Sequence, residues 1–90
     1  MSLEAIRSLL ANDPLRELVR YCKESHSTSE IVQHLLSRFS STISSSRDYW
    51  ERVVSDGLSP LERVGALTYT VGKWKTTQPA KDVLEKYFGG

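Results

Sequence analysis

The segment from Ser27 to Leu58 constrains the fold most, because it predicts two helices in succession joined by a polar turn. Ser27 and Glu30 form a capping box, in which the serine accepts a hydrogen bond from a backbone N–H and the glutamate reaches back to the cap. Apolar residues then recur at helical spacing as far as about Phe39. The first helix of the pair therefore has a defined beginning and one apolar face.

The turn and the second helix follow from a serine-rich stretch at residues 40–46. Ile43 interrupts the serines and is expected to return to the core. Serine side chains favour helix caps, so we expect the second helix to run from about Ser45 to Ser55. Gly57 is expected to end it, because glycine accepts the left-handed backbone of a helix C-cap.

Two amphipathic helices are predicted before this pair. Residues 3–11 form the first, with apolar side chains spaced along one helix face: Leu3, Ile6, Leu9 and Leu10. Asn12 or Asp13 caps the second, and Pro14 fits its first turn, where no backbone N–H is needed. Its apolar stripe reaches Cys22.

The segment after Gly57 allows two interpretations. Residues 59–65 look helical, because a serine, a proline and a glutamate stand where a helix start needs them. Residues 66–77 favour a β-hairpin that turns at Gly72-Lys73, since β-branched and aromatic residues flank that pair. The alternative is one helix over 59–72. A last helix opens at Pro79.

Composition limits the classes of function. Ninety residues suit one domain, and the net charge of +1 argues against a non-specific DNA coater and against an anionic membrane surface. Cys22 is the only cysteine, which excludes an intrachain disulfide and suggests a reducing, cytoplasmic setting. Charged residues interrupt the apolar positions near the N-terminus, so we expect neither a signal peptide nor a membrane span.

Catalytic and metal-binding patterns are weak in this chain. There is no glycine elbow around a serine and no phosphate-cradling glycine loop, so neither an enzyme nor a cofactor is expected. Cys22 and His26 have a spacing that can chelate a metal, and His34 follows. A buried cysteine with surface histidines fits the same residues better, and no metal site is predicted.

The order of these segments resembles the winged helix-turn-helix domain of small bacterial and archaeal transcription regulators. The likeness rests on Leu10–Val19, Thr28–Val32, Ile43–Tyr49 with Val53–Leu58, and Trp74–Thr77 with Ala80–Leu84. It implies a mainly α (α+β) single domain with an extra N-terminal helix and a small C-terminal β-hairpin. The helix-turn-helix core would span about 13–58, the wing 59–77 and the closing helix 78–88. The alternative is an all-α helical bundle.

The resemblance implies sequence-specific binding of double-stranded DNA by a homodimeric transcription regulator, with the helix that starts near Ser45 in the major groove. The DNA-binding residues implied are Ser44, Ser45, Ser46, Arg47 and Tyr49 at the start of that helix, His34 and Arg38 on the preceding helix, and Lys73 and Lys75 on the wing. The first helix would supply a dimer contact. Dimer or partner contacts are expected at Leu3, Ile6, Leu10, Tyr87 and Phe88.

A second hypothesis is a small helical adaptor or accessory subunit of a nucleic-acid machine, which the near-neutral charge favours. It would dock on a protein partner through Leu84, Tyr87 and Phe88, a spacing that resembles the peptide with which replication proteins bind the sliding clamp. The same spacing also fits the inner face of an ordinary amphipathic helix. Such a docking peptide must be exposed, whereas a closing helix buries these side chains.

Overall fold

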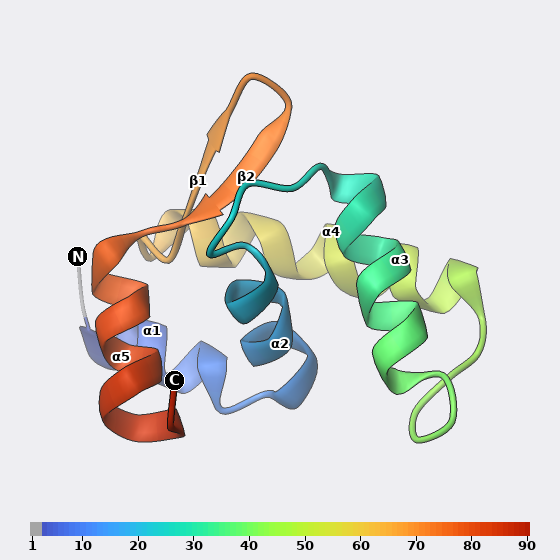
Figure 1. The fold of residues 1–90 in the computed structure, drawn as a ribbon, viewed down its shortest axis with the longest axis horizontal. Coiled ribbons are helices and arrows are strands. Elements are labelled where there is room, and N and C mark those ends of the chain that lie inside the picture. Colours follow the sequence, from blue (N-terminus) through green and yellow to red (C-terminus); the bar gives the residue numbers. More distant parts are fainter. Residues whose placement is uncertain (1–2) are drawn as a thin grey trace.

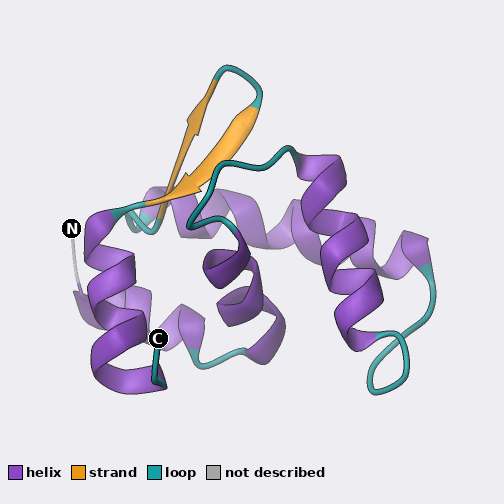
Figure 2. Ribbon diagram, viewed as in Figure 1, coloured by secondary structure: helices purple, strands orange, loops and turns teal. Residues whose placement is uncertain are grey.

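A computed structural model describes residues 3–90 of the chain. Over this range the fold is mainly α, with four helices, then one β-hairpin that projects from the helices, then a last helix (Figures 1 and 2). Their order is α1 (Leu3–Leu10), α2 (Asp13–Tyr21), α3 (Thr28–Phe39), α4 (Arg47–Arg63), β1 (Leu67–Thr70), β2 (Lys73–Thr76) and α5 (Gln78–Phe88). The mainly α (α+β) layout with a C-terminal hairpin is winged-helix-like, and the all-α alternative is wrong.

Helix starts follow the predicted caps. Asn12 is the N-cap of α2 and accepts a hydrogen bond from the backbone N–H of Leu15. The capping box of α3 is complete, with Ser27 and Glu30 each accepting a backbone N–H from the other. Thr77, which was expected to be the last residue of the returning strand, is instead the N-cap of α5 just before its N-terminal proline. These starts depend on short-range hydrogen bonds, which is why the sequence predicts them well.

The length of α4 was predicted wrongly, because the helix does not stop at Gly57. It continues through Gly57 and Pro60 to Arg63, so the supposed new helix start at residue 59 is its last part. Gly57 is buried, and a Cβ added there would lie 2.5 Å from Cδ2 of Leu15 in α2. The glycine therefore permits a close approach between α4 and α2 instead of ending the helix.

The hairpin is antiparallel, with Thr70 opposite Lys73 across its turn. The two turn residues are therefore Val71 and Gly72, one position earlier than predicted, and both have positive φ. The wing begins at β1 and not at residue 59, because residues 59–63 belong to α4. In the segment after Gly57, residues 59–63 are helical and residues 67–76 form the hairpin, as the sequence predicted for its two parts.

A third, single-residue strand joins the hairpin. The backbones of His26 and Trp74 exchange two hydrogen bonds, of 3.0 and 2.7 Å, across an antiparallel bridge. Farther along β2, buried Thr76 donates from its N–H to the Cys22 carbonyl and from its hydroxyl to the Val19 carbonyl. The loop between α2 and α3 is thus the neighbour that ties the hairpin to the helices.

The core combines side chains from every helix and from β1. Trp50 is fully buried, and its indole N–H donates to the Ser44 carbonyl at 2.8 Å, which holds the serine-rich loop against α4. Ile43 was expected in the core, and that prediction is wrong because its side chain is 46% exposed. The buried cluster comprises Ile6, Leu10, Leu18, Val19, Cys22, Ile31, Val32, Leu35, Phe39, Trp50, Val54, Leu58, Leu61, Ala66, Leu67, Ala80, Val83 and Leu84.

Helix α1 belongs to this core and is not a separate arm. It packs beside α5, and its Ile6 and Leu10 are fully buried. These two side chains were predicted as dimer contacts, and that prediction is wrong because they are used within the chain. The proposed docking peptide meets the same obstacle, since Leu84 of α5 is fully buried.

We expect Gly57→Val to destabilise the protein by roughly 1–3 kcal/mol, because the new side chain must displace Leu15 from the contact between α4 and α2. Ser55→Val is the matched control, since residue 55 lies exposed on the same helix. Urea unfolding followed by circular dichroism measures both. Equal losses would show that the close approach does not require glycine.

Thr76→Val should cost roughly 1–2 kcal/mol, because it keeps the shape of the side chain and removes a buried donor to the Val19 carbonyl. Thr70→Val, at an exposed position of β1, provides the control. Thermal unfolding of both variants gives the comparison. An unchanged midpoint for Thr76→Val would mean that this hydrogen bond does not anchor the hairpin.

Candidate nucleic-acid interface

The outward face of α4 is set by the side chains that the helix buries. Trp50, Val54, Leu58 and Leu61 turn inward at helical spacing. The opposite side of the helix presents an exposed line of two arginines and two serines, namely Arg52, Ser55, Ser59 and Arg63. Arg63 donates to the Ser59 hydroxyl at 3.4 Å. This line resulted from the unbroken helix and was not predicted, because the expected stop at Gly57 divided it.

Carboxylates flank this line. Helix α4 has three arginines against four acidic residues, and the acidic residues are Asp48, Glu51, Asp56 and Glu62. All four are exposed. The net charge of the helix side chains is therefore −1, which does not attract a polyanion, and any contact with nucleic acid must depend on placed hydrogen bonds and not on bulk charge.

The start of α4 contains the residues first predicted to contact DNA. Ser46 is the N-cap, and its hydroxyl accepts the Tyr49 N–H. Ser44 is half-buried, and its hydroxyl accepts the Ser46 N–H, whereas Ser45 is exposed. Two of the three serines thus act as local caps, as serine runs often do. Tyr49 is 40% exposed beside buried Trp50.

Arg47 is already partnered within the chain. Its guanidinium donates to Gln33 of α3 at 3.0 Å and lies 3.5 Å from a carboxylate oxygen of Glu51. Arg38 of α3 is exposed, with its guanidinium 5.1 Å from the centre of the Phe39 ring. Arg47 would have to exchange these partners to reach any ligand, whereas Arg52 is exposed and Arg63 donates only to the uncharged Ser59 hydroxyl.

His34 faces α2 and does not join the start of α4. Its Nε2 lies 2.8 Å from a carboxylate oxygen of Glu17, and its ring stacks on Tyr21 at 3.9 Å. His26 stacks on the same tyrosine at 3.8 Å, so Tyr21 is held between two imidazole rings. Partial burial, and then nearby Glu30, raise the pKa of Tyr21. The stack reinforces the loop that supports the hairpin.

Glu30 completes this support. The Ser27 N–H, and then His26, hold the pKa of the Glu30 carboxyl below its ordinary value. A carboxyl whose pKa falls on folding stabilises the fold above the unfolded-state pKa. That contribution disappears as the pH falls through the folded-state pKa. The capping box of α3 is thus fully formed at neutral pH.

The hairpin has two different faces. Tyr69 and Trp74 are cross-strand partners on one face, with their rings 4.6 Å apart, and the Trp74 indole donates to Thr28 at the start of α3. Lys73 and Lys75 lie exposed on the other face, opposite Thr70 and Thr68. The sequence predicted both lysines on the hairpin, and the structure places them on one face of it.

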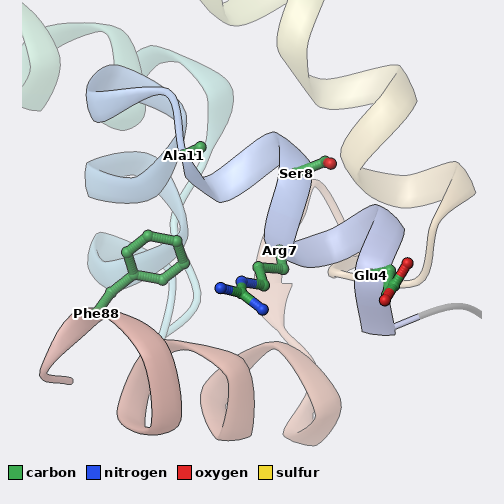
Figure 3. A pocket seen from close by; sticks show the side chains of 5 residues that line it. All are labelled: Glu4, Arg7, Ser8, Ala11 and Phe88. Atoms are coloured by element: carbon green, nitrogen blue, oxygen red, sulfur yellow. The ribbon is translucent and has the colours of Figure 1, made fainter.

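A second surface lies between α1 and α5. Figure 3 shows Arg7 and Phe88 facing one another across a shallow hollow that Glu4, Ser8 and Ala11 also line. The Arg7 guanidinium lies 4.0 Å from the centre of the Tyr87 ring. Leu3 is 56% and Tyr87 42% exposed. Of the predicted interface residues, only Leu3, Tyr87 and part of Phe88 are accessible.

Cys22 is fully buried. Within residues 3–90, no cluster of three or more histidine, cysteine or acidic side chains is arranged to hold a metal ion. In the same range, no helix is long and apolar enough to cross a membrane. No protein-family model, no curated protein and no solved structure matches this chain.

Burial raises the pKa of the Cys22 thiol to about 12, because the low-polarity core disfavours the thiolate. A thiol reagent added at pH 8 should therefore leave the folded protein almost unlabelled and react at once in denaturant. The readout is the absorbance of the released thiol chromophore. Rapid labelling of the native protein would contradict the burial of Cys22.

Proposed function

We propose that this chain binds double-stranded DNA in a sequence-specific manner, as transcription regulators do, through the hairpin and the outward line of α4. The observation that supports this most directly is the charge of the hairpin. Residues 67–76 contain Lys73 and Lys75 and no acidic residue. Since the chain has 12 basic and 11 acidic residues in total, the rest of it holds ten basic against eleven acidic side chains. The net positive charge lies on the hairpin.

The chemistry of α4 fits base recognition better than non-specific attraction. An arginine can donate two hydrogen bonds to guanine, so Arg52 and Arg63 are the proposed readers of bases in the major groove. Ser55 and Ser59 lie between the two arginines, and their hydroxyls can form hydrogen bonds with base edges or phosphates. The flanking carboxylates repel phosphates, so they weaken non-specific binding. They can also accept a hydrogen bond from the amino group of cytosine, so they favour particular bases.

The hairpin supplies the phosphate contacts in this proposal. Lys73 and Lys75 project from one face of β2 and reach the backbone beside the groove that α4 occupies. Arg47 and Ser45 at the start of α4, with Arg38 on α3, form the remaining edge of the proposed contact. A winged helix uses its helix for bases and its wing for the flanking backbone, and this division matches the residue types found here.

We also propose a homodimer, formed across the α1–α5 surface through Leu3 and Tyr87. Glu4 and Arg7 on α1, with Asp82 and Lys86 on α5, provide opposite charges around these apolar side chains. In a two-fold dimer each contact occurs twice, so an acidic side chain of α1 that meets a basic side chain of α5 in the second copy forms two ion pairs. Two copies would read a palindromic site with half-sites about one helical turn apart.

Binding of a protein partner is the second candidate function, and the carboxylates of α4 favour it. Exposed apolar side chains add to this, namely Leu3, Ile43 and Tyr87. An adaptor would use these surfaces and ignore duplex DNA. Titration of a random-sequence duplex pool at two salt concentrations, with sequencing of the bound fraction, separates the candidates. Enrichment of a palindrome with salt-sensitive affinity supports the regulator, and absence of binding at low salt leaves the adaptor.

Arg52→Ala should weaken binding to the enriched duplex by about 1–3 kcal/mol and relax the preference for one base pair, if Arg52 reads a guanine. Lys81→Ala on α5 removes the same charge away from α4 and should change the affinity little. Fluorescence anisotropy with the enriched duplex and with single-base variants measures both effects. Equal losses for the two variants would show that charge alone, and not Arg52, determines recognition.

A further inference from the structure

A small hollow lies where the first turn of α2 meets α4. Leu15 of α2 packs against Gly57, which has no side chain of its own to keep the two helices apart. Four of the lining positions, 53, 56, 57 and 60, recur at the spacing of one helix face. The hollow has a volume of about 250 Å³, and its lining residues are Asn12, Leu15, Val53, Asp56, Gly57 and Pro60.

Pro60 changes the backbone chemistry of this hollow. Within a helix, the N–H of residue 60 would donate to the carbonyl of Asp56, but proline has no N–H and its ring pushes that carbonyl aside. The Asp56 carbonyl therefore lacks its usual helical donor, and both residues line the hollow. It can accept a hydrogen bond from a ligand that supplies a donor.

The charge at the hollow is negative. The Asp56 carboxylate forms no ion pair within residues 3–90, and neither lysine nor arginine lines the hollow. A further acceptor is the side-chain oxygen of Asn12, which receives the Leu15 N–H and has a second lone pair. Val53 and Pro60 add apolar surface. Acceptors beside apolar walls, with no cation among them, fit a cationic donor that carries a small apolar group.

We propose that the hollow between α2 and α4 binds a small primary amine in its ammonium form. The three N–H groups of the ammonium donate to the Asp56 carboxylate, to the Asp56 carbonyl and to the side-chain oxygen of Asn12. The apolar part of the amine packs against Leu15, Val53 and Pro60. A volume of about 250 Å³ is below the range of drug-sized sites, so the ligand is a small free amine.

The apolar contact is needed as well as the charge. An ion pair at an exposed carboxylate contributes little by itself, because water and salt screen it. The apolar walls therefore select an amine with a hydrocarbon group over a simple cation. This site uses neither the outward line of α4 nor the hairpin, so the proposal does not depend on DNA binding.

Three probes test the class of ligand. Cyclohexylamine has both the charge and an apolar ring, cyclohexanol keeps the ring without the charge, and methylamine keeps the charge without the ring. Each is titrated at neutral pH and constant ionic strength into nitrogen-15-labelled protein, and the amide signals of the lining residues are followed by NMR. Cyclohexylamine should bind with a Kd on the order of 1–10 mM, and the other two roughly tenfold more weakly.

Variants of α4 test the two proposed acceptors. Pro60→Ala restores the N–H that the Asp56 carbonyl lacks, so it should unfold at a higher temperature and yet bind cyclohexylamine several-fold more weakly. Asp56→Asn should weaken binding about tenfold, because it removes the charge. Glu62→Gln is the matched control, since Glu62 is an exposed acidic residue of α4 outside the hollow, and it should bind as the original protein does.

Several results would overturn the proposal. Absence of shifts with cyclohexylamine, or equal shifts with cyclohexanol, would rule out an ammonium site. Equal binding by the Asp56→Asn and Glu62→Gln variants would show that overall charge alone attracts the amine. Unchanged binding by a more stable Pro60→Ala variant would exclude the Asp56 carbonyl as an acceptor. No DNA is present in these titrations, so failure of the proposed function would not alter them.

Discussion

The short pairing of His26 with Trp74 determines where the hairpin stands relative to the helices. A two-stranded hairpin is marginally stable alone in water, and this one is long enough for only a four-residue register. The His26 backbone adds a third strand, and Thr76 anchors β2 to the end of α2 through two hydrogen bonds. Since His26 also stacks on Tyr21, the wing position is coupled to α2 and to the start of α3.

The two elements of the proposed DNA-binding surface differ in charge. The hairpin is basic and projects from the body (Figure 1), whereas α4 mixes arginines with carboxylates. A surface of this kind binds phosphates modestly and discriminates among bases strongly, because unpaired charges oppose the wrong partner. The near-neutral net charge is thus compatible with specific recognition, provided that the hairpin holds its lysines in place.

Two departures from local preference appear in these same elements. Gly57 and Pro60 both lower the helix propensity of α4, yet the helix persists because Val54, Leu58 and Leu61 are buried along one face. Val71 departs from the preferred turn chemistry with no burial to offset it. The first departure is therefore explained by packing within the chain, whereas no packing within residues 3–90 explains the second.

The sequence alone determined the features that depend on neighbours along the chain. Asn12, Ser27 with Glu30, and the hairpin before Pro79 all act through hydrogen bonds or backbone preferences within a few residues. The apolar spacing likewise predicted most helices. The lysines of β2 could also be found, because side chains alternate along a strand.

Only the tertiary structure decided the length of α4, the role of α1 and the face that His34 presents. Gly57 was predicted to stop a helix, but it lies inside α4 where Leu15 of α2 packs against it. Ile6 was predicted to contact a partner, but it is fully buried in the core of the chain. The exposed line from Arg52 to Arg63 followed from the first of these facts. Each depends on residues distant in the chain, whose burial outweighs the local preferences that a sequence displays.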